Sequence, residues 1–206
     1  KSRTAKVKQE HNISNNQSLL FDASNLAAFL YRLKHNYEKS YNEIVETIRL
    51  IAPYFDDFML EPKESNDELI VLRWHQKGCE DVFNASQLSD GTLRFICLTA
   101  LLLQPSELQP ATIIVDEPEL GLHPYAITMF AEMVKQVSSK KQIIISTQSV
   151  ELLNEFDVED VVVVNKDNDG SSKFSRLNED ELKDWLDDYS LGDLWQKNIL
   201  GGRLSK

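Results

Sequence analysis

Apolar residues recur at helical spacing in the first quarter of the chain. A first helix is predicted to start near Asn25, with Asp22 or Ser24 as its cap. Its apolar stripe consists of Leu26, Phe29, Leu30 and Leu33. A second helix is predicted over residues 41–51, and Pro53 ends it because proline cannot continue a helix.

The segment that follows has the composition of short strands. Strands are predicted at residues 57–61, 68–75 and 81–83, of which 68–75 has β-branched and aromatic content, and Lys77-Gly78 offers a turn between the last two. We therefore expect a helical and β-hairpin subdomain over residues 22–85. The polar residues 1–21 are typical of a linker or tail.

From Ser86 onward, helices and strands alternate. An apolar helix is expected over 93–103 and another over 124–137, with buried strands at 112–115, 142–146 and 160–165. The unbroken apolar run 112–115 is typical of a strand covered on both faces. The last thirty residues again show helical spacing. This alternation predicts an α/β fold with a mostly parallel sheet flanked by helices, in a lobe spanning residues 86–206.

Charge and cysteine content limit the class of protein. The net charge of −11 argues against a surface that coats DNA. Four basic residues, Lys1, Arg3, Lys6 and Lys8, lie in the first eight positions, where a frayed basic tail is the simplest interpretation. Two cysteines without metal-ligand spacing, no signal peptide and no membrane-length apolar run indicate a reduced cytoplasmic protein without a membrane partner.

The central chemical signal is a pair of acids at the end of the strand 112–115. Ligands of α/β sheets bind at the carboxyl ends of strands, where Asp116 could hold Mg²⁺ and Glu117 could orient or deprotonate a water. Successive strand residues point in opposite directions, so a turn at Pro118 is needed to bring both acids to one site. The alternative is a pair of solvated acids that cap the helix starting near Pro124.

Two further segments place polar groups near these acids. The loop 88–92 opens a helix, and the Ser89 hydroxyl and Gly91 amide at a helix N-terminus favour a phosphate, although an ordinary cap would look the same. The strand 142–146 is followed by Gln148, which a neighbouring strand would deliver beside the acids.

The ordered motifs LSDGTLRF, IIVDEPELGLHP and IIISTQSVELL resemble those of the RecF/SMC-like predicted bacterial ATPases. The resemblance covers about residues 25–202 and implies the C-terminal half of an ABC-type ATPase head, whose cofactors are ATP and Mg²⁺. It implies that Asp116 supports Mg²⁺ and that Glu117 is the general base. It further implies that Ser89, Gly91, Gly121 and His123 face a nucleotide held by a second head.

The same resemblance implies partners that the chain itself does not contain. Gln148 falls at the position of a switch histidine and would donate to the γ-phosphate. ATP would join two heads into a homodimer, and DNA is a possible partner, in repair or phage defence. The sequence contains no GxxxxGK[ST] motif, so the P-loop is expected in a missing N-terminal half, and residues 1–206 alone are expected to be inactive.

Two other functions stay open from the sequence. One is a nucleotide-gated dimerisation module without significant hydrolysis, which would not need Glu117 as a base. The other is a metal-dependent nuclease that uses Asp116, Glu117, Glu119 and His123.

Overall fold

The computed structural model describes residues 4–167 and 169–201, so Lys1, Arg3 and the end of the predicted C-terminal lobe lie outside the described residues. The chain divides into two compact units, residues 1–144 and 145–206. Each unit is described below by itself. The three-part division predicted from the sequence stays a prediction.

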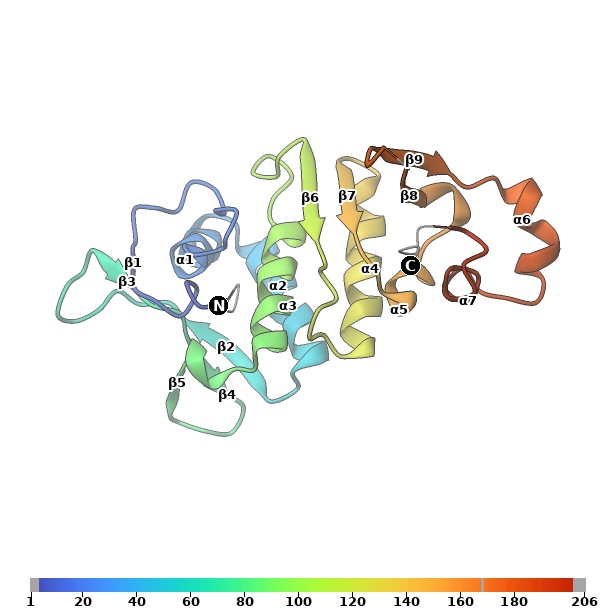
Figure 1. Ribbon diagram of the computed structural model, residues 1–206. Coiled ribbons are helices and arrows are strands. Elements are labelled where there is room, and N and C mark those ends of the chain that lie inside the picture. The colour runs from blue at the N-terminus through green and yellow to red at the C-terminus, as the bar shows by residue number, and fades with distance from the viewer. Residues whose placement is uncertain (1–3, 168, 202–206) are drawn as a thin grey trace. The chain divides into compact units, whose positions relative to one another are not determined.

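Four helices form the body of the first unit (Figure 1): α1 (Leu26–Asn36), α2 (Glu38–Ile51), α3 (Asp90–Leu103) and α4 (Pro124–Ser138). All four were expected, and α2 and α3 each start three residues earlier than the pattern predicted. The predicted cap of α1 is wrong, because Asn25 precedes the helix. Its side chain accepts from the Leu20 amide and donates to the carbonyl groups of Asn15 and Ser18, so it fastens the preceding loop instead.

The helices pack around one apolar core. Phe29, Leu33 and Ile48 are fully buried between α1 and α2, and Phe130 is fully buried on α4. Helix α3 is buried on most of its surface, including Leu93, Phe95, Ile96, Ala100 and Leu102. It packs against both α2 and α4. Burial on several sides fixes the position of α3, which matters because its first turn carries part of the candidate site.

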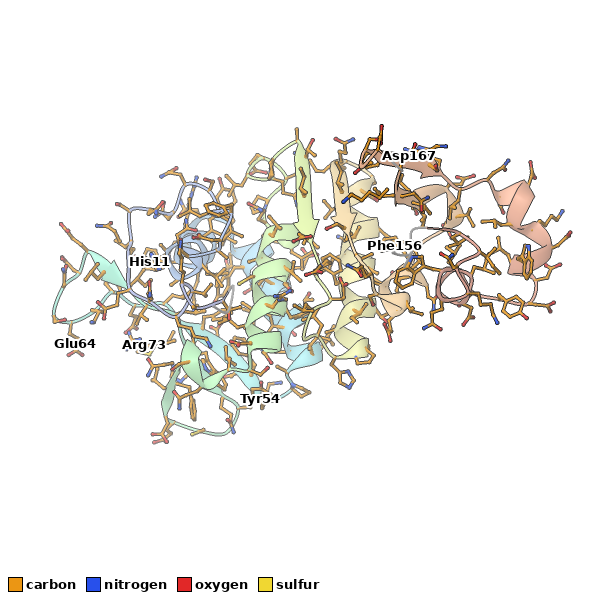
Figure 2. All side chains as sticks on the ribbon, in the orientation of Figure 1. His11, Tyr54, Glu64, Arg73, Phe156 and Asp167 are labelled. Atoms are coloured by element: carbon orange, nitrogen blue, oxygen red, sulfur yellow. The ribbon has the colours of Figure 1, made fainter. Side chains whose placement is uncertain are left out.

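The predicted hairpin is confirmed as an antiparallel sheet in the order β2-β4-β5, formed by β2 (Phe55–Met59), β4 (Arg73–Gln76) and β5 (Val82–Asn84). An aromatic pair joins the sheet to α2, since Tyr41 meets Phe58 edge-on with ring centroids 6.5 Å apart, and within the sheet Trp74 stacks on Phe55 at 5.9 Å. Tyr54, labelled in Figure 2, meets Trp74 edge-on at 5.7 Å. A short 3₁₀ helix, Ala85–Gln87, leads from β5 towards α3.

The described part of the N-terminal segment is not a frayed tail. The short strands β1 (His11–Asn12) and β3 (Leu69–Ile70) pair antiparallel, and Val7 is buried. Lys6 forms an ion pair with Asp22 at 2.8 Å, which is another tie to the start of α1. Pairing with residues far along the chain is a tertiary effect that the polar composition did not indicate.

Strands β6 (Thr112–Asp116) and β7 (Gln142–Ser146) pair with each other and point the same way in Figure 1. The expectation that residues 112–115 are covered on both faces is wrong for this chain. Ile113 is 3% exposed, but Ile114 on the opposite face is 74% exposed. Ile144 of β7 is 48% exposed. The apolar run therefore has one buried face and one open face.

The second unit contains α5 (Val150–Leu153), a 3₁₀ turn (Val158–Asp160), β8 (Val162–Lys166), β9 (Ser172–Arg176), α6 (Glu179–Leu186) and α7 (Leu191–Gln196). The two terminal helices were expected. Strand β9 was not, because Ser172–Arg176 is mostly exposed and has no apolar alternation; it pairs antiparallel with β8. A small core that includes Val163, Leu194 and Leu200 holds the unit together. None of the helices within the described residues is long and apolar enough to cross a membrane.

Candidate functional site

The candidate site starts where β6 ends. Ile113 anchors the strand in the core, and Asp116 is its last residue, with an exposed side chain. Glu117 follows and is partly buried, and Pro118 is buried. The two acids are thus carried by a strand end whose position is fixed on both sides by buried residues.

Glu117 has an unusual backbone. Its φ angle is +46°, in the left-handed region that residues with a side chain rarely adopt. The change of chain direction expected at Pro118 therefore already begins at Glu117. Such a conformation costs about 1–3 kcal/mol and persists only where the surroundings enforce it. Among the described residues, the non-glycine positions with positive φ are Ala23, Glu117 and Asn198.

One contact that holds this backbone comes from α3. Nη1 of Arg94 donates to the carbonyl oxygen of Glu117 at 2.8 Å, and the same oxygen accepts from the Leu120 amide at 3.4 Å. The partner of the Arg94 guanidinium is thus a main-chain carbonyl and not a carboxylate. Only its place one turn after the helix start hinted at a role.

Ser89 is the N-cap of α3. Its Oγ accepts from the Thr92 amide at 3.0 Å and lies 2.8 Å from Thr92 Oγ1. The residue is exposed, while Leu88 before it is buried and anchors the turn. The capping function considered from the sequence is thus present, and when Thr92 Oγ1 donates to Ser89 Oγ, the exposed Ser89 hydroxyl keeps a proton for another acceptor.

Gly91 and Gly121 bring two separate motifs into contact. A Cβ atom added to Gly91 would overlap the carbonyl oxygen of Gly121 and lie 3.2 Å from its carbonyl carbon. Only glycine allows the first turn of α3 to approach the loop 117–123 this closely. Gly121 itself has a φ of +79°, which also favours glycine. Two of the predicted site residues therefore meet through their backbones.

His123 ends this loop and caps α4. Its Nδ1 accepts from the Tyr125 amide at 3.2 Å, and Pro124 occupies the first turn of the helix. The cap requires Nδ1 without a proton, so a neutral ring carries its proton on Nε2. His123 is exposed and can therefore present Nε2–H to a ligand while it caps the helix.

Asp90, the acid of the loop 88–92, interacts with the N-terminal segment. One of its carboxylate oxygens accepts from Lys8 Nζ at 2.9 Å and from the Thr4 hydroxyl at 2.9 Å. These contacts offset the negative charge that would otherwise face an anionic ligand at the start of α3.

Gln148 belongs to the second unit and is exposed, two residues after β7. The turn around it is fixed by a hydrogen bond from the Ser149 amide to Thr147 Oγ1 at 2.9 Å. Ser149 then caps α5. The expected position of Gln148 beside Asp116 and Glu117 stays a prediction.

The exposed acid at the end of β6 suits a Mg²⁺ site that is shared with substrate phosphates. Among residues 4–167 and 169–201, no three His, Cys, Asp or Glu side chains are grouped so that they could hold a metal by themselves. Mg²⁺ in phosphoryl-transfer sites is held by one or two carboxylates together with substrate phosphates. Asp116, exposed at the strand end, fits that arrangement.

Comparison with known proteins identifies the family. The chain belongs to the AAA_21 family, described as "AAA domain, putative AbiEii toxin, Type IV TA system", whose model matches residues 2–154. No curated protein sequence matches the chain significantly. The match includes α3, β6 and the loop after it, so the candidate site residues Ser89, Gly91, Asp116, Glu117, Gly121, His123 and Gln148 all lie within the family's region.

Solved structures show which fold this is. One, from work on ATP-driven dimerisation and DNA-stimulated activation of SMC ATPases, has a TM-score of 0.55 and 18% identity, over 77% of this chain and 95% of that one. An SMC head bound to the C-terminal winged-helix domain of ScpA gives 0.58 and 17%, over 84% of this chain and 50% of that one. An SMC head from Pyrococcus furiosus gives 0.56 and 19%, over 77% and 39%.

The predicted α/β fold of an ABC-type ATPase head is thus confirmed. The chain spans nearly the whole of the first of these structures, but half or less of the other two. At identities below one fifth, the likeness concerns the fold.

Proposed function

We propose that the chain is one part of an ATP-hydrolysing head, in which Glu117 activates the attacking water. The observation that carries the proposal is the left-handed backbone of Glu117 directly after β6. Strained non-glycine residues that their surroundings hold in place cluster at active sites, and this one is a carboxylate at a strand end.

In this proposal each residue of the site has one task. Asp116 supports Mg²⁺, which would neutralise charge on the transferring phosphoryl group. Glu117 orients the water and accepts its proton. Ser89, Gly91, Gly121 and His123 offer hydroxyl, amide and ring donors to a nucleotide bound by a second head, and Gln148 donates to its γ-phosphate. Two heads therefore join when ATP is bound and separate after hydrolysis.

The P-loop of this head is supplied by a segment outside residues 1–206. The open apolar face of β6 and β7 supports this part of the proposal, since Ile114 is 74% exposed on a strand whose sequence suits burial on both faces. The partial coverage of two SMC heads agrees with it. The partner that hydrolysis acts on is DNA, in repair or in phage defence; with a net charge of −11, contact is confined to a local patch.

Phosphate release from ATP tests the proposal. We expect hydrolysis by the chain joined to its P-loop segment and none by residues 1–206 alone. Glu117→Gln should lower kcat about 10²- to 10⁴-fold, the range of a general base, and should keep ATP-dependent dimerisation. If parent and Glu117→Gln dimerise alike and turn over equally, the protein is a nucleotide-gated dimerisation module instead. Hydrolysis by residues 1–206 alone would contradict an external P-loop.

A further inference from the structure

Helix α3 contacts the loop after β6 at two points. Arg94 donates from Nη1 to the carbonyl oxygen of Glu117 at 2.8 Å. One turn earlier, Gly91 lies against the Gly121 carbonyl so closely that a Cβ atom would overlap it. Both contacts end on main-chain atoms of residues 117–121, so they constrain the backbone of the loop rather than one of its side chains.

The helix is rigid where these contacts are made. The neighbours of Arg94 on the helix, Leu93, Phe95 and Ile96, are each at most 1% exposed. Arg94 and Cys97, three residues further along, are less buried and lie on the same side of the helix. The backbone of Arg94 is thus carried by a helix fixed in the core, and a planar guanidinium loses less conformational entropy per hydrogen bond than a flexible ammonium group does.

The contact bears on the strained residue itself. The Glu117 carbonyl belongs to the peptide unit that leaves the left-handed residue, and two donors, Arg94 and the Leu120 amide, hold it. A hydrogen bond from a charged donor is stronger than one from a neutral amide. Without Arg94, the 3.4 Å hydrogen bond from the Leu120 amide would be left to hold this carbonyl, so the backbone of Glu117, and with it the side chain, would be less firmly positioned.

We propose that Arg94 is a positioning residue that holds Glu117 in its left-handed conformation, and that α3 thereby links two sites. The first turn of α3 carries Ser89 and Gly91, which in the proposed dimer face the nucleotide of the other head. The same helix fixes Glu117, which acts on the nucleotide of its own head. This inference rests on the proposed function.

The first test needs no ATP hydrolysis. Hydrogen exchange of the Leu120 and Leu122 amides, which close the loop onto Glu117 and Glu119, is measured in residues 1–206. We expect Arg94→Ala to speed exchange of both by about 10- to 100-fold, the effect of losing one charged hydrogen bond, and Arg94→Lys to restore part of it. Arg32→Ala is the matched control, since Arg32 Nη1 also donates to a carbonyl, that of Gln17 at 2.6 Å, outside this loop. Unchanged exchange in Arg94→Ala would overturn the proposal.

The second test uses the chain joined to its P-loop segment. Arg94→Ala should lower kcat by a similar factor, with the KM for ATP unchanged, because Arg94 contacts the base and not the nucleotide. In a Glu117→Gln background, Arg94→Ala should cost nothing further. Multiplicative effects of the two substitutions, or a change in KM alone, would overturn the positioning role. If Glu117→Gln itself leaves kcat unchanged, the proposed function fails, whatever the loop exchange shows for Arg94.

Discussion

Ser89 Oγ accepts a 3.0 Å hydrogen bond from the Thr92 amide, and so the residue proposed to touch a nucleotide also caps the helix that carries it. Capping and ligand binding make separate demands on this position. A cap needs only a side-chain acceptor, whereas a phosphate needs a donor and no negative charge. Substitutions can therefore tell the two functions apart.

Ser89→Asp should keep the fold and lose the ATP-dependent dimer. Aspartate caps helices as well as serine does, so the free energy of unfolding should change little. Its carboxylate would, however, repel the γ-phosphate of the partner head. Ser89→Ala should lose both the cap and the hydroxyl donor, so about 1 kcal/mol of stability and the ATP-dependent dimer should both be lost.

The measurements are urea denaturation for stability and light scattering with ATP for dimerisation, and Ser89→Asn serves as a neutral capping control. An Ser89→Asp protein that dimerises with ATP as well as the parent would leave Ser89 with a capping role alone.

The sequence predicted the parts of the site that depend on local pattern. The strand that leads into the two acids, a helix opened by the loop 88–92 and the start of α4 at Pro124 follow from apolar periodicity and capping rules, although α3 begins at Asp90 and not at the expected residue 93. Their order along the chain was enough for the fold. These features could be predicted because they depend on residues close together in sequence.

The parts that were missed depend on tertiary contacts. The Arg94 contact spans 23 positions of the chain, and the approach of Gly91 to Gly121 depends on how α3 packs. The pairing of Lys8 with Asp90 spans 82 positions. The spacing of apolar residues does not indicate which residues distant in sequence will pair. The exposure of Ile114 was missed for another reason. A run of β-branched residues indicates that a strand can be buried on both faces, but it does not indicate whether the chain contains the segment that covers each face.

The N-terminal segment gives a prediction about acid stability. The hydrogen bond from Lys6 is the main cause that lowers the pKa of Asp22 from its ordinary 3.8 to about 2, and the Ser24 hydroxyl and amide add to it. A carboxylate whose pKa is lower in the folded state stabilises the fold fully above pH 3.8. This contribution should shrink as the pH falls below 3.8 and vanish as it passes through about 2.

NMR titration of the Asp22 carboxyl group measures the pKa directly. In Lys6→Gln it should move back towards 3.8, and the loss of stability between pH 4 and pH 2 should become smaller than in the parent. Asp22→Asn should show the same smaller loss, since it cannot titrate. A parent Asp22 that titrates near its ordinary value would mean that the ion pair with Lys6 does not form in solution.

The two faces of β6 give the sharpest test of what the chain lacks. Ile113 and Ile114 are neighbours with the same side chain, yet they are 3% and 74% exposed. In residues 1–206, Ile113→Thr should cost about 2 kcal/mol or more, because it buries a hydroxyl and opens a void. Ile114→Thr should change the free energy of unfolding by no more than about 0.5 kcal/mol, as expected of an exposed position. Threonine keeps the β-branched shape in both, so the difference in cost reflects burial.

In the chain joined to its P-loop segment, the cost of Ile114→Thr should rise towards that of Ile113→Thr, since the open face would then be covered. An Ile114→Thr cost that stays small in the joined protein would mean that the P-loop segment packs elsewhere, and the exposed face of β6 and β7 would need another occupant.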